Sequence, residues 1–237
     1  MTFLQMQTDA IDLLHELENH SSYSLTKLKE YLNRGNLEFV RKTNCIEGTI
    51  DIITVVNQFE YTEAATATLQ YLKAPTQVRY IDAATDVGTP LSPFRGGYNN
   101  LPQTKSYGTP SSYWLRNLAG KSRAAGDNIT AFTGFRIGTW PICGTSDKTL
   151  RIDGYLWPQT LVDNTDVPEY KDGWHDAPVY YAAYRMYMIF SHLRKTWRQK
   201  ALDNKALFDE LVFDAQQEIS VQDDSPTLPI DVTEQWD

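Results

Sequence analysis

The fold is decided by residues 179–219, VYYAAYRMYMIFSHLRKTWRQKALDNKALFDELVFDAQQEI. It contains no proline and no glycine, and its apolar side chains recur at the spacing of three and four residues that is typical of an amphipathic α-helix. Asp176 can cap such a helix, and Pro178 suits its first turn. The polar residues 200–205 mark the place where we expect any break into two helices. The sequence therefore predicts a long helical segment in the last third of the chain.

One face of this segment carries a stripe of large apolar side chains at Met186, Phe190, Leu193 and Trp197. The successive spacings of four, three and four residues place them on one side of a helix. A stripe this apolar requires a partner inside the protein. We expect it to pack on the first two helices of the same chain.

Two helices are predicted at the beginning of the chain. The first runs from about residue 2 to residue 19, where the sequence His20-Ser21-Ser22 breaks it. The second starts near Ser24 or Thr26 and runs to about residue 43, with Gly35 as the expected position of a kink or break. The apolar positions expected to meet the C-terminal stripe are Leu14, Leu17, Leu28 and Leu32.

The middle of the chain has the pattern of short β-strands. Residues 49–56 are rich in β-branched side chains, and residues 78–81 and 149–156 alternate between apolar and polar side chains. Between them, residues 82–112 are predicted to form a long loop. A loop of that length in a compact domain is usually a binding or assembly element, so we expect it at a subunit contact.

These elements together predict an α+β fold in which the terminal helices form a helical bundle that carries a central β-rich insertion. The expected divisions are residues 1–47 plus 170–220 for the helical domain and 48–169 for the β-rich insertion with its long loops. The remaining residues, 221–237, carry five acidic side chains and no Lys or Arg. We expect them to form an extended acidic arm that becomes ordered only against a neighbouring protein.

Composition narrows the function. The net charge of −8 and the pI near 5.0 argue against a protein that grips nucleic acid, which requires a basic face, although DNA could still pass an acidic surface without binding it. The apolar runs are too short to span a membrane. The two cysteines, Cys45 and Cys143, lack the spacing of a metal site, and we interpret them as small, partly buried residues of a protein that assembles in a reducing cytoplasm.

Signatures of common enzymes are absent from the sequence. It contains no glycine-rich phosphate loop, no helix with paired histidines, no Cys-x-x-Cys and no Gly-x-Ser-x-Gly. The stretch Ser24-Leu25-Thr26-Lys27 fits Ser-x-x-Lys, but it lies where a helix cap is needed, and we interpret it as a cap. The prediction is therefore that the protein is not an enzyme and has no catalytic, cofactor-binding or metal-binding residues.

Other polar groups also have simple structural interpretations. The histidines His15, His20, His175 and His192 are dispersed over three predicted elements. Asp153, Asp163 and Asp166 could be paired carboxylates of a glycoside hydrolase, but Asp163–Pro168 is interpreted as a turn-rich linker. The loop Arg95-Gly96-Gly97-Tyr98 is favoured as an interface loop over a contact to nucleic acid. The numerous aromatic side chains fall largely at helical spacing, which favours a core or a subunit interface over a sugar-binding surface.

The order of short motifs resembles that of the head-to-tail adaptor (connector or neck) proteins of tailed bacteriophages. The similar segments are Leu32-Asn33 followed by Glu38–Arg41, Gln58–Tyr61, Gly108–Tyr113, Tyr155–Pro158 followed by Asp163–Pro168, and the closing helix at 179–219. The chain departs from the family pattern after Tyr61, where Thr62-Glu63 stands in place of a proline.

This resemblance implies a structural protein of the virion neck, assembled in the host cytoplasm without a cofactor. It implies a ring of about twelve copies beneath the portal protein, with tail or nozzle proteins on its other side. DNA would pass through the channel without sequence-specific binding. The alternatives are a carbohydrate-binding or hydrolytic tail-associated protein, or another neck component such as a tail terminator or completion protein.

Overall fold

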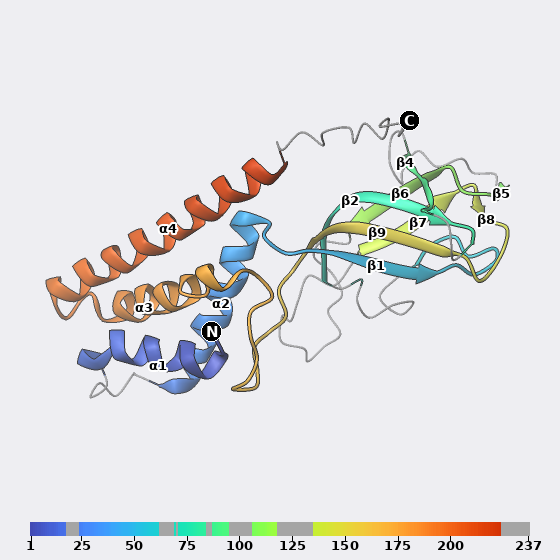
Figure 1. Cartoon of the computed structure of the whole chain (residues 1–237). Coiled ribbons are helices and arrows are strands. Elements are labelled where there is room, and N and C mark those ends of the chain that lie inside the picture. Colours follow the sequence, from blue (N-terminus) through green and yellow to red (C-terminus); the bar gives the residue numbers. More distant parts are fainter. Residues whose placement is uncertain are drawn as a thin grey trace, which may run out of the picture. The chain divides into compact units, whose positions relative to one another are not determined.

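The computed structural model describes residues 1–17, 24–61, 69, 71–83, 87–94, 106–117 and 135–223. Within these residues the chain has a mixed α+β fold, as predicted, with four α-helices and several small sheets. It divides into two compact units (Figure 1). One unit comprises Met1–Cys45 and Thr160–Asp237, and the other comprises Ile46–Gln159.

The helical unit begins with α1 (Phe3–Leu13), which Thr2 caps in a reciprocal capping box with Gln5. The helix ends earlier than predicted, because the backbone tightens at Leu14 and continues into the 3₁₀ turn η1 (His15–Leu17). The predicted end at residue 19 lies outside the described residues.

Helix α2 (Leu25–Thr43) runs through Gly35 without interruption, so the predicted break at this glycine is wrong. The reason is a close approach to α3 (Ala177–Phe190). A Cβ atom on Gly35 would lie only 2.8 Å from the Cα of Pro178 and 3.0 Å from the Cβ of Tyr181. Glycine at this position therefore lets the two helices pack closely, at a modest cost in helix propensity.

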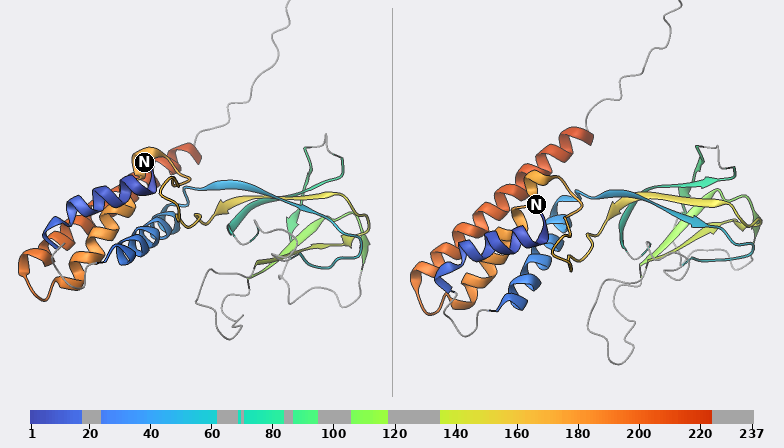
Figure 2. Two further views of the ribbon diagram at one scale, coloured as in Figure 1. Left: turned by 90° about the horizontal axis from the view of Figure 1, so that it is seen from below. Right: turned by 60° about the horizontal axis from the view of Figure 1, so that its bottom comes forward.

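The C-terminal helical segment does divide into two helices, but at residues 191–194 and not at 200–205. Helix α3 ends at Phe190, a turn follows in which the amide of Leu193 donates to the carbonyl of Phe190, and α4 (Lys195–Asp223) begins. The polar stretch stays inside α4, where the Asn204 side chain donates to the carbonyl of Lys200. The turn allows α4 to run back alongside α3 (Figure 2).

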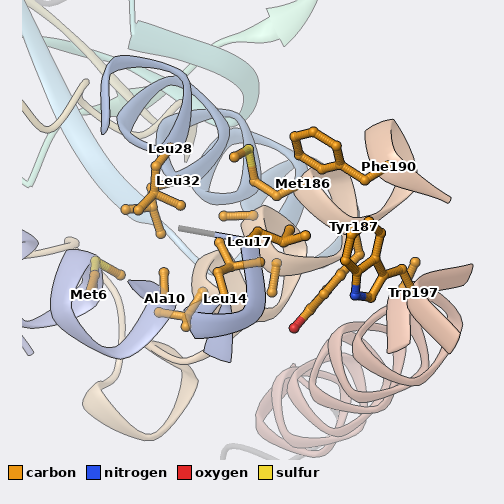
Figure 3. Packing of buried hydrophobic residues seen from close by; sticks show 14 of the residues in the cluster. Met6, Ala10, Leu14, Leu17, Leu28, Leu32, Met186, Tyr187, Phe190 and Trp197 are labelled. Atoms are coloured by element: carbon orange, nitrogen blue, oxygen red, sulfur yellow. The ribbon is translucent and has the colours of Figure 1, made fainter. Parts of the chain in front are cut away.

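The core of the helical unit draws apolar side chains from all four helices. Trp197 is 1% exposed, and its ring meets that of Phe190 edge to face at 6.2 Å between centroids. Met186 and Phe190 are buried as predicted, but Leu193 is 53% exposed, because it lies in the turn and not on a continuous helix. Figure 3 shows the cluster, which includes the predicted partners Leu14, Leu17, Leu28 and Leu32.

The β-rich unit contains an antiparallel sheet in the order β1-β9-β2-β3, with smaller sheets beside it (Figure 1). Its strands are β1 (Glu47–Ile53), β2 (Leu72–Ile81), β3 (Thr89–Pro90) and β9 (Thr149–Leu156). A second sheet contains β4 (Ser92–Pro93), β6 (Ser112–Asn117) and β7 (Phe135–Trp140), and β5 (Tyr107–Gly108) pairs with β8 (Ile142–Cys143).

Alternating side chains of the main sheet build the core of this unit. Ile50 and Ile52 of β1 and Leu150 and Ile152 of β9 are all buried, as strand alternation requires. The first strand is shorter than the predicted 49–56. It ends at Ile53, and the chain then turns through Asn57, whose φ is 63°.

The predicted loop at 82–112 is partly wrong, because its described residues contain the short strands β3, β4 and β5. Backbone hydrogen bonds explain this: the amide of Leu91 donates to the carbonyl of Val78, and the amide of Phe94 donates to the carbonyl of Tyr113. Residues 84–86 and 95–105 of the predicted loop lie outside the described residues.

Residues 160–169 pack with the helical unit, although the sequence prediction placed them in the β-rich insertion. Leu161 is buried in the helical core, and the Asn33 side chain both accepts from its amide at 2.7 Å and donates to its carbonyl at 2.9 Å. The carbonyls of Asn164 and Asp166 accept from the first amides of α1. These contacts shift the division of the chain from residue 170 to residue 160.

Candidate interaction surfaces

The residues with a catalytic-like pattern have structural roles. Ser24 is the N-cap of α2, and its hydroxyl accepts from the amide of Lys27 at 3.2 Å, which confirms the interpretation of Ser-x-x-Lys as a helix cap. The Asp166 carboxylate accepts from the amides of Val162 and Asp163 and thereby holds the turn before α3. Asp153 belongs to the β-rich unit, where it pairs with an arginine.

The histidines are held by the backbone. His175 is buried, and its Nε2 lies 2.8 Å from the carbonyl oxygen of Tyr170. The Nδ1 atoms of His15 and His192 each lie 3.0 Å from a carbonyl oxygen three residues earlier in the chain. His20 lies outside the described residues. Among the described residues, no group of three or more His, Cys, Asp or Glu side chains is placed to hold a metal ion.

Both cysteines are free thiols. Cys45 is half-buried. Cys143 is buried in the β-rich unit, where its thiol donates to the carbonyl of Thr145 at 3.0 Å and lies 3.6 Å from the Tyr80 hydroxyl. Burial raises the pKa of Tyr80 to about 12, so this hydroxyl keeps its proton. The loop at 95–98, predicted as an interface loop, lies outside the described residues.

The outer face of the main sheet neutralises its own charges. Arg151 binds the Asp51 carboxylate through two nitrogens, and Arg79 binds that of Asp153 in the same way. The Thr49 hydroxyl also donates to Asp153 at 2.8 Å. The hydrogen bond from Arg151 lowers the pKa of Asp51, so both carboxylate and guanidinium remain charged at neutral pH. This face is therefore polar but balanced.

Strand β1 forms an unprotected edge of the same sheet. It pairs only with β9 among the described residues, and it contains neither lysine nor proline. Apolar side chains follow at its end, where Ile53 is 58% exposed and Val55 and Val56 are also exposed. The opposite edge is covered in part by β3 and interrupted by Pro75. The exposed side chains within β1 are mostly polar, but an unpaired strand edge that ends in exposed apolar residues can still pair with another chain.

A second exposed surface lies where α3 meets α4. We define the α3–α4 corner as residues 188–198. Beside His192 and Thr196, its exposed side chains are apolar or basic: Met188, Ile189, Leu193, Arg194, Lys195 and Arg198. Residues 177–202 contain five Lys and Arg and no Asp or Glu, within a chain whose net charge is −8. The charge of the helical unit is therefore strongly segregated along α3 and α4.

Comparison with known proteins assigns the chain to a family. The chain matches the family model described as SU10 adaptor protein over residues 1–229. The chain belongs to the SU10 adaptor protein family. The predicted resemblance to phage head-to-tail adaptors is thereby confirmed at the level of the family, and the protein is a bacteriophage adaptor with a structural role. A comparison with curated proteins finds no match.

Two features of the protein were not predicted from its sequence. The basic corner was detectable, because the run of 26 residues without an acidic side chain is visible in the sequence. The free edge of β1 was not detectable, since the pairing of β1 with β9 joins residues about one hundred positions apart. The family match ends at Pro229 and therefore includes two of the five acidic residues of the C-terminal stretch, Asp223 and Asp224. No helix in the described part of the adaptor is long and apolar enough to cross a bilayer.

Proposed function

We propose that this protein is a ring-forming head-to-tail adaptor that sits beneath the portal of a tailed phage and connects it to the tail. The observation that carries the proposal is the family match, which extends over residues 1–229 of 237 and therefore includes both units. In this role the protein extends the DNA channel in the virion neck. It acts as a scaffold of protein contacts and performs no catalysis.

The exposed surfaces support an assembly role. A ring subunit needs at least two different surfaces, because each copy meets its two neighbours in a head-to-tail manner. The edge of β1 and the α3–α4 corner are two such surfaces, and they lie in different units of the chain. The net charge of −8 also suits a channel wall, since an acidic surface repels the DNA backbone and lets it slide.

The distribution of aromatic side chains disfavours the carbohydrate-binding alternative. Sugar-binding surfaces present exposed aromatic rings. The large aromatic residues Trp114, Trp197, Tyr61 and Tyr187 are instead fully buried. Among the residues whose burial the structure describes, Tyr107, at 50%, and Phe213, at 58%, are the only aromatic residues that are largely exposed. Where the structure describes their burial, aromatic residues are therefore mostly buried or half-buried and seldom largely exposed.

The proposal is tested by the native mass of the purified protein, measured alone and after mixing with the portal protein of the same phage. An adaptor of this kind should bind the portal and add a defined number of copies to the ring, about twelve. Binding to the end of a tail tube without binding to the portal would instead identify a tail terminator. Release of sugar from a polysaccharide, or retention on glycans with no affinity for the portal, would refute the adaptor role.

A further inference from the structure

The α3–α4 corner places positive charge where a helix is least suited to hold it. Helix α4 begins at Lys195, and its first turn contains no acidic residue. The N-terminus of a helix carries partial positive charge from its unpaired amides, so Lys195 and Arg198 are unfavourable there. Neither side chain has an acidic partner among the described residues. A cluster that is locally unfavourable and unpaired suggests an anionic partner from outside.

The same corner also exposes apolar surface. Leu193 is more than half exposed, and Met188 and Ile189 near the end of α3 are exposed beside it. The Arg194 guanidinium lies over the ring of Trp197, 4.8 Å from the ring centroid. The corner therefore suits a partner that is both acidic and apolar.

The C-terminal stretch of the chain has this composition. Residues 224–237 contain four acidic side chains and no Lys or Arg. They also contain Leu228, Ile230 and Val232, which alternate along the sequence as in an extended segment, and Trp236. We infer that the α3–α4 corner of one copy docks the acidic segment 224–237 of a second copy. This inference builds on the proposed assembly into a ring.

The segment after α4 is too short for its first acidic residues, Asp224 and Asp231, to reach the α3–α4 corner of the same copy. From Arg198 to Asp223 the helix rises by roughly 37 Å at 1.5 Å per residue. A fully extended chain covers at most about 3.6 Å per residue, so Asp231 lies no more than roughly 29 Å from the end of α4. Asp224 and Asp231 therefore cannot return to Arg198 of the same copy. A neighbouring copy can supply them.

Nucleic acid is the less favoured partner. A phosphate backbone would satisfy the basic side chains, but it offers nothing to the exposed Leu193, Met188 and Ile189. The net charge of −8 would also repel it from the rest of the chain. An acidic peptide with regularly spaced apolar side chains satisfies both components of the corner.

The test uses a fluorescent synthetic peptide of residues 221–237 and full-length protein, with binding followed by fluorescence anisotropy at low and moderate salt. The peptide should bind saturably to the wild-type chain. The variant Lys195→Glu/Arg198→Glu should weaken binding by about tenfold or more. Because acidic residues are favourable at a helix N-terminus, this variant should fold normally, which circular dichroism verifies.

A matched control carries the same change in charge on another helix. Lys27 and Arg34 are exposed on α2, and Lys27 also lies in a first helical turn. Lys27→Glu/Arg34→Glu should bind the peptide as the wild type does. A peptide in which Asp224, Asp231 and Glu234 are replaced by Lys should lose affinity for the wild type and gain affinity for the Lys195→Glu/Arg198→Glu variant.

Three results would overturn the inference: no binding of the peptide, equal loss in both double variants, or binding of a short DNA duplex at the corner without binding of the peptide. The peptide assay requires neither portal nor ring. Failure to bind the portal with peptide binding intact would therefore count against the proposed function alone. Portal binding with no affinity for the peptide would count against the docking site alone.

Discussion

Substitution of Gly35 by alanine separates two physical effects of opposite sign. Helix propensity alone predicts that alanine stabilises the middle of α2 by about 1 kcal/mol. The structure predicts the reverse, because the new methyl group would lie 2.8 Å from the Cα and 3.0 Å from the carbonyl oxygen of Pro178. These are backbone atoms that cannot rotate away. Overpacking of this kind costs about 1–3 kcal/mol, so we expect a net destabilisation of about 1–2 kcal/mol.

The assay is chemical denaturation of the full-length protein, followed by far-UV circular dichroism, which reports mainly on the helical unit. Gly173→Ala is the matched control. Gly173 lies in η4 (Asp172–Trp174), and a Cβ there would meet no atom within 4 Å. The control should change the free energy of unfolding by less than about 0.5 kcal/mol. An alanine variant at Gly35 that is more stable than the wild type would refute the close approach of α2 and α3.

Three further predictions concern the core, the C-terminal stretch and the sheet. Trp197→Ala should cost about 3–5 kcal/mol in unfolding free energy, whereas Leu193→Ala should cost little; equal effects would contradict the buried position of Trp197. Deletion of residues 224–237 should leave helical content unchanged and impair docking to the ring or the portal, and unimpaired docking would disprove an assembly role. The pKa of Asp51 is lower in the folded state than in the unfolded state, so its ionised carboxylate stabilises the fold at pH values above the unfolded-state pKa of about 4. This stabilisation is lost as the pH falls through the folded-state pKa. Asp51→Asn should therefore reduce the loss of stability in acid. The effect should stay below about 1 kcal/mol because the pair with Arg151 is partly exposed, and an unchanged acid unfolding profile would count against it.

The elements that the sequence predicts correctly are those with a local signal. The alternation of apolar and polar side chains that buries Leu150 and Ile152 lies within the eight consecutive residues of β9. The cap at Ser24 likewise depends only on the four consecutive residues from Ser24 to Lys27. Both are decided by backbone geometry, so no distant part of the chain is needed to find them.

The errors arise where distant residues decide the outcome. The turn at 191–194 contains neither glycine nor proline, and it forms because α4 packs back onto α3. Gly35 fits inside a helix because Pro178, more than one hundred residues later, packs against it. Residues 160–169 join the helical unit through Asn33, whose side chain satisfies the backbone of Leu161. Such tertiary contacts override local propensity.

The candidate surfaces show the same division between local and distant information. The basic character of the α3–α4 corner follows from composition, but its exposure depends on a turn that the sequence does not reveal. The apolar residues at the end of β1 were predicted to continue the strand, and the structure instead leaves Val55 and Val56 exposed beyond its last residue. Function of this kind depends on which apolar residues remain outside the cores.

The two ends of the β-rich unit lie side by side, since β1 and β9 pair from Glu47 opposite Tyr155 to Ile53 opposite Thr149. A segment whose entry and exit are adjacent can lengthen, shorten or be exchanged while the host helices keep their places. Natural selection can therefore remodel residues 46–159 and leave the helical unit almost untouched. Related adaptors should vary most in length within this segment, and a recombinant that exchanges it whole should still fold.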